Sequence, residues 1–292
     1  MIYEEQWRDY ELLDVSEGNR LERWGEHILI RPDPQVIWKN EYPHRLWTKA
    51  GGVYSRSSSG GGSWDKKSLP GSWVIGYEPL GLRFKVSPMN FKHTGLFPEQ
   101  AVNWKWAHEQ LTVDSGRSTV KNVLNLFGYT GGATVAAAKA GAKVCHVDAS
   151  KGMIAHAKEN MALNSLSYAP VRFIADDCVK FAERELRRGN HYDAVILDPP
   201  SFGRGAGGEV WKLEEHLFGL LELVVKLLSD TPLFILVNLY TAGIAPSCAG
   251  YMLNMLTAGR GGRVYADEIG LKVSATGAAF PCGSFARWES GG

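Results

Sequence analysis

Residues 120–148 constrain the fold of this chain more than any other stretch of its sequence. Val120–Leu126 is a short apolar run with β-branched residues, too short for a helix, and it predicts a buried strand. Phe127–Gly132 follows with three glycines, which permit backbone angles and close approaches that other residues forbid. An alanine-rich helix over Ala133–Ala140 and a second strand over Lys143–Val147 complete a βαβ unit.

An acid closes the second strand of this unit, since Asp148 lies twenty residues after Gly128. In nucleoside-binding βαβ units, loop amides at the helix N-terminus hold an anionic group, and such an acid accepts hydrogen bonds from ribose hydroxyls. The loop lacks the G-x-G-x-x-G pattern of dinucleotide sites. Its looser pattern favours a cofactor with an amino-acid carboxylate in place of a pyrophosphate, S-adenosylmethionine (SAM).

Length and composition indicate one large and one smaller globular domain, with 292 residues, 45% apolar and 22% charged. The net charge of +1 neither supports nor excludes a nucleic-acid substrate. The four cysteines fit no zinc or redox motif, and no histidine has a partner at metal-ligand spacing, so we expect no metal site. Without a signal peptide or membrane span in the sequence, we expect a cytoplasmic protein that binds no membrane.

Residues 1–90 predict a small β-rich N-terminal domain, for which substrate recognition is the role considered, and residues 91–292 predict a SAM-binding methyltransferase domain. Eight of the ten tryptophans lie before residue 110. Alternating runs at His27–Arg31 and Trp73–Tyr77 are typical of strands, and Ser55–Gly62 of a flexible loop or hairpin tip. We expect most of these aromatic residues to form a core rather than to stack on bases.

From residue 120 onward, strands and helices alternate, which predicts a doubly wound α/β fold with a parallel sheet. The further expected strands are Val171–Ile174, Ala194–Leu197, Leu233–Asn238 and Ser284–Trp288. The further expected helices are Asn103–Thr112, Lys151–Leu163 (capped by Ser150), Val179–Arg188, Glu209–Leu228 and Ala249–Leu256.

Polar residues or glycines follow four successive expected strands. They are the glycine loop, Asp148, Asp176-Asp177 and Asp198-Pro199-Pro200. Ligands bind beyond the carboxyl ends of strands in an open parallel sheet, so these segments predict one site at that edge. Acids that merely cap strands or helices would explain any one of them, but poorly explain all four.

The segment Asp198-Pro199-Pro200 is the most specific of these strand ends. Consecutive prolines cannot donate to a sheet ladder, so they make a stiff loop whose carbonyls and preceding carboxylate point outward. Such acceptors suit an N–H of a flat aromatic substrate, and Phe202 offers a face on which it could stack. The alternative, an ordinary proline turn covered by an aromatic ring, explains this segment equally well when it is taken alone.

Together these motifs resemble the class I SAM-dependent methyltransferases, over Asn122–Asn164 and Tyr192–Phe202. In detail the chain resembles the ribosomal-RNA large-subunit methyltransferases with a D-P-P-x-F motif, over about residues 91–240. Their N-x-F-x-Y-T-G-G motif is matched by Asn125, Phe127, Tyr129, Thr130, Gly131 and Gly132. Their T-G-x-x-x-x-Q segment is matched by Thr94, Gly95 and Gln100.

The resemblance implies a seven-stranded, mostly parallel sheet whose last strand is antiparallel. It implies that Asp148 binds the ribose, that Asp177 contacts the adenine amino group and that Phe127–Gly131 line the methionine moiety. The cofactor-binding residues implied are Gln100, Asn125, Phe127, Gly128, Tyr129, Thr130, Gly131, Asp148, Ala149, Asp176, Asp177 and Asp198. The catalytic residues implied, which would frame the target base, are Asp198, Pro199, Pro200 and Phe202.

One departure from the family pattern bears on the target atom. Cytosine-C5 members carry a nucleophilic cysteine just after the fifth strand, where this chain reads Val237-Asn238-Leu239-Tyr240. We therefore expect SAM-dependent methylation of a base nitrogen, guanine favoured, in ribosomal RNA. The alternatives are a cytosine-C5 RNA methyltransferase, a protein or small-molecule methyltransferase, an NAD-dependent oxidoreductase and a non-catalytic RNA-binding module. The sequence gives neither the target nucleotide nor the oligomeric state.

Overall fold

A computed structural model of the chain divides it into two compact units. The structure describes residues 1–57, 61–66, 68–89, 91–113, 120–204 and 210–291. The smaller unit consists of Tyr3–Val102 and Gly270–Pro281, and the larger of Met1–Ile2, Asn103–Ile269 and Cys282–Gly292. Segments from both ends of the chain therefore contribute to each unit.

The smaller unit is β-rich. Its main sheet has the strand order β2 (Tyr10–Ser16), β3 (Asn19–Trp24), β4 (His27–Pro32), β5 (Gly52–Arg56), β6 (Gly62–Asp65). A hairpin pairs β7 (Trp73–Tyr77) with β8 (Leu82–Val86). The strands predicted over residues 27–31 and 73–77 are thus confirmed. The predicted glycine-rich tip joins the antiparallel strands β5 and β6, and residues 58–60 of it lie outside the described residues.

A late segment of the chain joins the smaller unit. The backbone amides of Ser274 and Ala275 donate to the carbonyls of Leu12 and Leu13 at 2.9 and 3.0 Å. These contacts extend the unit with Gly270–Pro281, which carries the adjoining ends of two long strands. No local pattern predicts such a link, because it joins opposite ends of the sequence.

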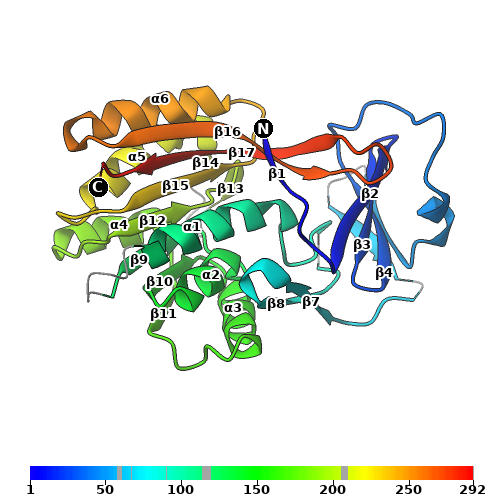
Figure 1. The fold of residues 1–292 in the computed structure, drawn as a ribbon, viewed down its shortest axis with the longest axis horizontal. Coiled ribbons are helices and arrows are strands. Elements are labelled where there is room, and N and C mark those ends of the chain that lie inside the picture. The colour runs from blue at the N-terminus through cyan, green and yellow to red at the C-terminus, as the bar shows by residue number, and fades with distance from the viewer. Residues whose placement is uncertain (58–60, 67, 90, 114–119, 205–209, 292) are drawn as a thin grey trace. The chain divides into compact units, whose positions relative to one another are not determined.

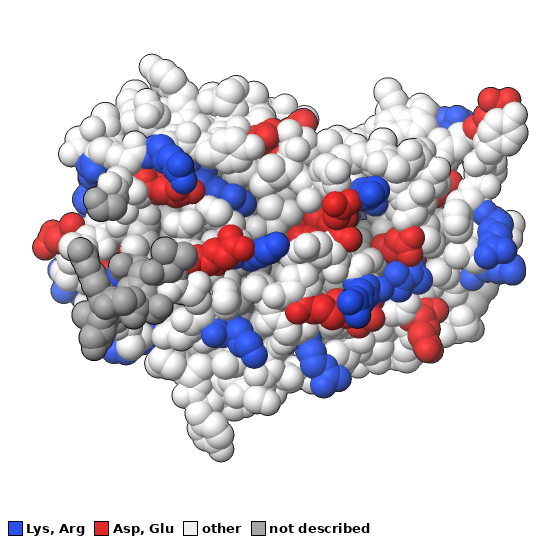
Figure 2. Space-filling view, in the orientation of Figure 1, with Lys and Arg blue, Asp and Glu red and all other residues white. Residues whose placement is uncertain are grey.

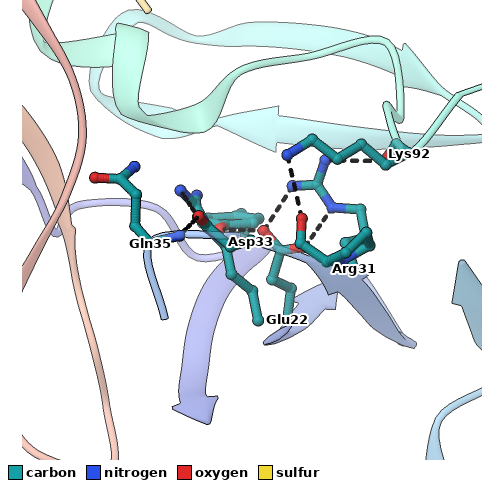
Figure 3. A network of polar contacts seen from close by, with 8 residues as sticks. Glu22, Arg31, Asp33, Gln35 and Lys92 are labelled. Carbon is teal, nitrogen blue, oxygen red and sulfur yellow. Dashed lines mark hydrogen bonds and ion pairs between the residues drawn. The ribbon is translucent and has the colours of Figure 1, made fainter. Parts of the chain in front are cut away.

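Aromatic side chains and one charged network fill the core of the smaller unit. Trp24 and Tyr77 are fully buried, as expected for core aromatics. Arg31 Nε and Nη2 donate to the two carboxylate oxygens of Glu22 at 2.5 and 2.7 Å, and Tyr10 OH donates to Glu22 Oε1 at 2.9 Å. Figure 3 shows Arg31 facing Glu22, with Asp33 and Lys92 beside them. Every charge at the centre of this network has a partner.

The larger unit carries most of an eight-stranded sheet. In spatial order its strands are β1 (Ile2–Glu4), β16 (Arg263–Lys272), β17 (Ala279–Glu289), β15 (Phe234–Leu239), β12 (Ala194–Leu197), β9 (Asn122–Leu126), β10 (Lys143–Asp148) and β11 (Val171–Ala175). The five strands from β15 to β11 are parallel, and β17 is antiparallel to β15. This confirms the predicted fold class, with the short β1 added to the seven expected strands.

Helices cover both faces of this sheet. They are α1 (Ala101–Val113), α2 (Gly132–Lys139), α3 (Lys151–Leu163), α4 (Cys178–Arg187), α5 (Leu213–Lys226) and α6 (Pro246–Thr257). Figure 1 shows α1, α2 and α3 on one side of the sheet, and α5 and α6 on the other. Phe181 of α4, Leu217 of α5 and Leu253 of α6 share one core with Leu124 and Val195 of the sheet. The parallel sheet is therefore buried on both faces.

The helix predicted over residues 209–228 was wrong at its start. Val210–Lys212 forms β14, which pairs antiparallel with β13 (Phe202–Arg204), and α5 begins at Leu213. The apolar spacing of this segment fits a helix, but pairing with β13 determines its conformation. The final strand is also longer than predicted, and the position of β16, whose first six residues are exposed or half-buried, was not predicted.

The surface carries both signs of charge. On the face drawn in Figure 2, cationic and anionic side chains are interspersed, and the described residues there form no continuous basic stripe. None of the helices within the described ranges is long and apolar enough to span a membrane.

Candidate active site

The carboxyl ends of four parallel strands lie level at one edge of the sheet. Leu126 of β9 is opposite Val147 of β10 and Leu197 of β12, and Asp148 is opposite Ala175 of β11. The chain runs from β9 outward to β11 and then returns to β12 on the other side of β9. This reversal is a topological switch point beside β9, the position at which ligands bind in open α/β sheets.

The loop after β9 has an unusual backbone. Phe127 and Tyr129 have φ values of 57° and 50°, and Gly131 has a φ of 87° at the N-cap of α2. Left-handed angles cost a residue with a side chain about 1–2 kcal/mol, and strain of this kind clusters at functional sites. The amide of Gly128 donates to Val147 O at 3.0 Å, which holds the strained loop against β10.

A buried polar network supports this loop from beneath. Asn125 Nδ2 donates to Thr134 Oγ1 at 2.8 Å, and Thr134 Oγ1 lies 2.8 Å from His146 Nδ1. A Cβ on Gly128 would lie 2.4 Å from His146 Cε1, so only glycine fits over the ring. Burial lowers the pKa of His146 to about 4, and the ring is neutral at physiological pH. Asn125, predicted to bind the cofactor, is 2% exposed, and its side-chain amide donates to Thr134 in the network beneath the loop.

Helix α3 holds the second half of the loop. Asn160 Nδ2 donates to Thr130 O at 2.8 Å, and Asn160 is fully buried. A Cβ on Gly131 would lie 2.9 Å from Ala157 Cβ, so the loop and α3 are in close contact there. Sequence analysis missed His146 and Asn160, because a lone polar residue in a buried strand or helix carries no motif.

Asp148 joins this loop to the end of β10. Its Oδ2 accepts from the amide of Tyr129 at 2.9 Å, and its Oδ1 accepts from the amide of Ser150 at 2.8 Å. Burial raises the pKa of Asp148, and the two amides offset this only in part. Each carboxylate oxygen has further lone pairs, which are available to ribose hydroxyls. Ala149 follows directly and is exposed.

The acids after β11 have protein partners. Asp177 caps α4, with its Oδ1 accepting from the amide of Lys180 at 2.8 Å. Asp176 forms an ion pair with Arg184, and its amide donates to Asp148 O at 3.0 Å. These acids lie level with Asp148, and their contact with adenine stays a prediction.

The segment after β12 forms the other half of the edge. Asp198 is half-buried, Pro199 is buried and Pro200 is exposed, and the Asp198 amide donates to Leu126 O at 3.3 Å. Phe202, at the start of β13, is 56% exposed and offers a free aromatic face. The Pro200 carbonyl, expected to face a substrate, instead accepts a 2.7 Å hydrogen bond from Trp211 Nε1.

Trp211 is a site residue that sequence analysis missed. Its ring stacks on His216 at a centroid distance of 5.1 Å, and it lies 6.0 Å from the ring of Phe127. The residue falls within the segment predicted as helix, so its place in β14 beside the proline loop was hidden. An aromatic cluster thus borders the edge between Phe127 and Pro200.

Gln100 belongs to the other compact unit. It ends a short 3-10 helix over Pro98–Gln100 and is 4% exposed. Its predicted place beside the cofactor remains a prediction. Among the described residues, no group of three or more His, Cys, Asp or Glu side chains is arranged to hold a metal ion.

Comparisons with known proteins agree with this geometry. Residues 62–238 match the family described as S-adenosylmethionine-dependent methyltransferase. A crystal structure of a SAM-dependent methyltransferase from Agrobacterium tumefaciens is 36% identical, with a TM-score of 0.91, and the match covers 99% of this chain and 92% of that one. A putative SAM-dependent methyltransferase from Streptococcus mutans has a TM-score of 0.71 at 19% identity, covering 97% and 76% of the two chains, which shows the shared fold.

Curated relatives are much longer than this chain. Ribosomal RNA large subunit methyltransferase K/L of Shewanella frigidimarina is 38% identical over 156 residues, which is 52% of this chain and 20% of that protein. The protein of the same name from Pseudoalteromonas atlantica is 37% identical over 150 residues, with 51% and 20% covered. The match therefore spans about a fifth of the length of these relatives.

Proposed function

The chain belongs to the S-adenosylmethionine-dependent methyltransferase family, and from this premise we propose that it methylates a base nitrogen, guanine favoured, in ribosomal RNA. It is a methyltransferase that uses SAM, which leaves the NAD-dependent and non-catalytic alternatives without support. The aromatic edge around the D-P-P-x-F motif carries the proposal. Phe202 is exposed there, four residues after the half-buried Asp198, and Trp211 donates to the carbonyl of the intervening Pro200.

The cofactor half of the proposal rests on the glycine loop and Asp148. When bound, SAM supplies a methyl group that its sulfonium already activates. The chain then has to position the acceptor, and correct alignment provides much of the rate. We assign the ribose to Asp148, the methionine moiety to Phe127–Gly131, and the adenine to Asp177 with Asp176 and Ala149. Asn125 takes part through Thr134, as a residue that supports the loop.

The acceptor half rests on Asp198, Pro199, Pro200 and Phe202. A flat base can stack on Phe202 while its N–H donates to the Asp198 carboxylate. A ring or exocyclic nitrogen can attack with its own lone pair once loss of its proton is assisted, and a carboxylate can give that assistance. The names of the curated relatives support ribosomal RNA as the source of the base, over the fifth of their length that the match covers.

Residues 1–90 are proposed to recognise the RNA around the target base. Trp38 and Tyr42 are 43% and 85% exposed in this region, and neighbouring Ile37 is 90% exposed. Exposed aromatic faces of this kind stack on bases in single-stranded segments. Removal of both rings in a Trp38→Ala, Tyr42→Ala variant should raise the KM for RNA and leave SAM affinity unchanged.

The proposal is tested with labelled SAM and large-subunit RNA isolated from a strain that lacks the gene. The wild-type protein should label this RNA on a purine nitrogen. Asp198→Ala should lower turnover far more than SAM affinity, whereas Asp148→Ala should lower SAM affinity first. An equal loss of both in Asp198→Ala would assign Asp198 to the cofactor, and no labelled RNA would favour a protein or small-molecule acceptor.

A further inference from the structure

A buried arginine without a carboxylate partner lies on the α1 side of the sheet. Arg287 of β17 is 6% exposed, and no ion pair involves it among the described residues. Its guanidinium carbon lies 4.4 Å from the ring centroid of Trp106 and 4.3 Å from that of Phe285. Burial lowers its pKa to about 10, so it remains charged at neutral pH.

Stability alone does not account for this arginine. A buried charge without a counter-ion is unfavourable, and aromatic faces compensate for the lost hydration only in part. Apolar residues of similar volume often stabilise such positions more than charged ones do. Within the described part of the chain, Arg287 Nε is buried without a hydrogen-bond partner, so the bond that Nη2 makes is the place to look for the role of this residue.

Arg287 begins a hydrogen-bonded chain that continues through the side-chain amides of Asn103 and Asn238. Because a guanidinium can only donate, it determines which way both amides are oriented. Its Nη2 donates to Asn103 Oδ1, and Asn103 Nδ2 donates to Asn238 Oδ1 at 2.7 Å. A guanidinium has donors and no acceptor, so Asn103 must present its oxygen to Arg287 and its nitrogen to Asn238. Asn238 must then accept from Asn103, and its own Nδ2 is directed away from that residue.

Asn238 lies at the same edge as the acceptor half of the proposed site. Leu197 of β12 is opposite Val237 of β15, which puts the following residues, Asp198 and Asn238, side by side. Side chains alternate along a strand, so Asn238 shares its sheet face with Leu236, the residue opposite Arg287. Asn238 is 4% exposed, which makes it a shielded group next to the half-buried Asp198.

We propose that Asn238 is a specificity-determining residue of the methyl-acceptor site, which presents Nδ2 as a hydrogen-bond donor beside the Asp198 carboxylate, and that Arg287 fixes this orientation through Asn103. The pair then recognises an edge with an N–H next to a carbonyl oxygen or ring nitrogen, as guanine has at N1 and O6. This inference rests on the proposed acceptor site and adds the residue that distinguishes one edge from another.

Asn103→Asp tests the orientation without changing the shape of the side chain. Its carboxylate would accept from Arg287 as Asn103 does, and would also accept from Asn238. The side-chain amide of Asn238 would therefore rotate, so that Nδ2 donates to the new carboxylate at position 103 and Oδ1 faces the substrate base. Asn238→Asp puts a hydrogen-bond-accepting oxygen at the same place directly, because it replaces Nδ2 itself by a carboxylate oxygen. Asn254→Asp, on the exposed surface of α6, is the matched control.

Three measurements separate the outcomes. SAM affinity by calorimetry should stay within about threefold in all variants, since none alters the glycine loop. With RNA from the deletion strain, kcat/KM should fall about tenfold or more in Asn103→Asp and Asn238→Asp, and stay unchanged in Asn254→Asp. By NMR, the side-chain amide of Asn238, identified by its loss in Asn238→Asp, should exchange with water faster in the wild type than in Asn103→Asp.

Equal kcat/KM for RNA in the wild type and Asn103→Asp, with equal exchange rates, would overturn the inference and leave the RNA proposal intact. If the wild type methylates no RNA, the proposed substrate is wrong, and the exchange rates alone decide the orientation. Unequal exchange rates support the inference in that case, and equal rates overturn it.

Discussion

Two buried arginines, one in each compact unit, show how differently the units treat a charge. Arg31 of the smaller unit meets both oxygens of Glu22 (Figure 3). Burial acts to raise the pKa of Glu22, but the charge and hydrogen bonds of Arg31, together with Arg20 and Tyr10, lower it. Arg287 of the larger unit meets an amide and two aromatic faces, and burial lowers its pKa to about 10. The first network is closed, in the sense that Arg31 and Glu22 are each other's partners. The second continues through Asn103 to Asn238, at the carboxyl end of β15.

The two networks differ in whether their last hydrogen-bonding group already has a partner within the protein, and this difference indicates different roles. In the smaller unit, Glu22 and Arg31 satisfy each other on adjacent strands, so the pair can hold β3 to β4 without a ligand. In the larger unit, donors pass from Arg287 through Asn103 to Asn238, and the last donor needs an acceptor. We therefore assign the Glu22–Arg31 network to the stability of the fold and the chain from Arg287 to Asn238 to the proposed recognition of the base.

The largest predicted effect follows from this contrast. Arg31→Met leaves Glu22 buried without its partner, which should cost about 3–5 kcal/mol of unfolding free energy. Arg287→Met removes a charge that forms no ion pair among the described residues and that the carboxylate of Glu289 stabilises only in part, so it should change the unfolding free energy by less than about 1 kcal/mol while it depresses methyl transfer. Urea unfolding followed by tryptophan fluorescence measures both, with Trp24 near Arg31 and Trp106 near Arg287 as reporters.

A double variant controls for lost packing in that comparison. Glu22→Leu with Arg31→Met removes both charges, so it should recover most of the stability that Arg31→Met alone loses. A large loss in Arg287→Met, similar to that in Arg31→Met, would mean that the two networks have the same structural role.

The second prediction concerns the loop above the neutral His146. Gly128→Ala forces a methyl group onto a fully buried ring, which should cost about 1–3 kcal/mol and weaken SAM binding at least about tenfold. Gly152→Ala is the matched control, because the nearest atom to its Cβ is Ser150 Oγ at 3.7 Å. That helix position should gain about 0.5–1 kcal/mol. Unaltered SAM affinity in Gly128→Ala, measured by calorimetry, would contradict the role assigned to the loop.

The third prediction tests the proposed contact between Asp148 and the ribose of SAM. Asp148→Ala should lose charge-assisted bonds to two hydroxyls, at a cost of roughly 2–4 kcal/mol of SAM affinity. Folding should change little, because the residue ends a strand at the edge of the sheet. Calorimetry that finds wild-type affinity would remove Asp148 from the site.

The role proposed for Asp148 also predicts a pH dependence of SAM binding. Burial raises the pKa of Asp148 in the free protein, and hydroxyl donors favour the carboxylate, so the bound form has the lower pKa. Affinity should be full above the free-protein pKa and fall about tenfold per pH unit below it, down to the bound-form pKa. In the absence of SAM, the raised pKa of Asp148 affects the unfolding free energy with the opposite sign. The folded protein then holds this proton more tightly than the unfolded chain, so Asp148 stabilises the fold most at low pH. Asp148→Asn should bind weakly with a flat profile over this range, and a wild-type profile in that variant would assign the titration to another group.

Local patterns predicted much of this molecule, and long-range contacts account for what they missed. The βαβ unit needs only a short apolar run, a glycine loop and a helix, and the helix over residues 151–163 with its Ser150 cap was correct to the residue. The β14 strand, the link of Ser274 to Leu12, and the bond from Asn103 to Asn238 depend on partners far along the chain. The position of the strand-end acids at one edge could be predicted because each ends or directly follows a parallel strand, whereas the places of His146 and Trp211 required the fold.

The smallest predicted effect concerns the cysteines, and it tests whether the acceptor edge works without a covalent bond. Methylation of a pyrimidine at carbon 5 needs a thiolate that adds to carbon 6, whereas a guanine nitrogen has its own lone pair. Cys145 is buried, which raises its pKa to about 11, and buried Cys178 accepts a hydrogen bond at Sγ from the amide of Phe127 at 3.2 Å. Cys282 is also buried, so exposed Cys248, in the first turn of α6, is the remaining candidate. Cys248→Ser, and replacement of all four by serine in a stable variant, should leave methyl transfer largely intact. A denaturation-resistant adduct with 5-fluorocytosine RNA that disappears in Cys248→Ser would instead establish cytosine chemistry, and would replace the donor–acceptor pair of Asn238 and Asp198 by a nucleophile.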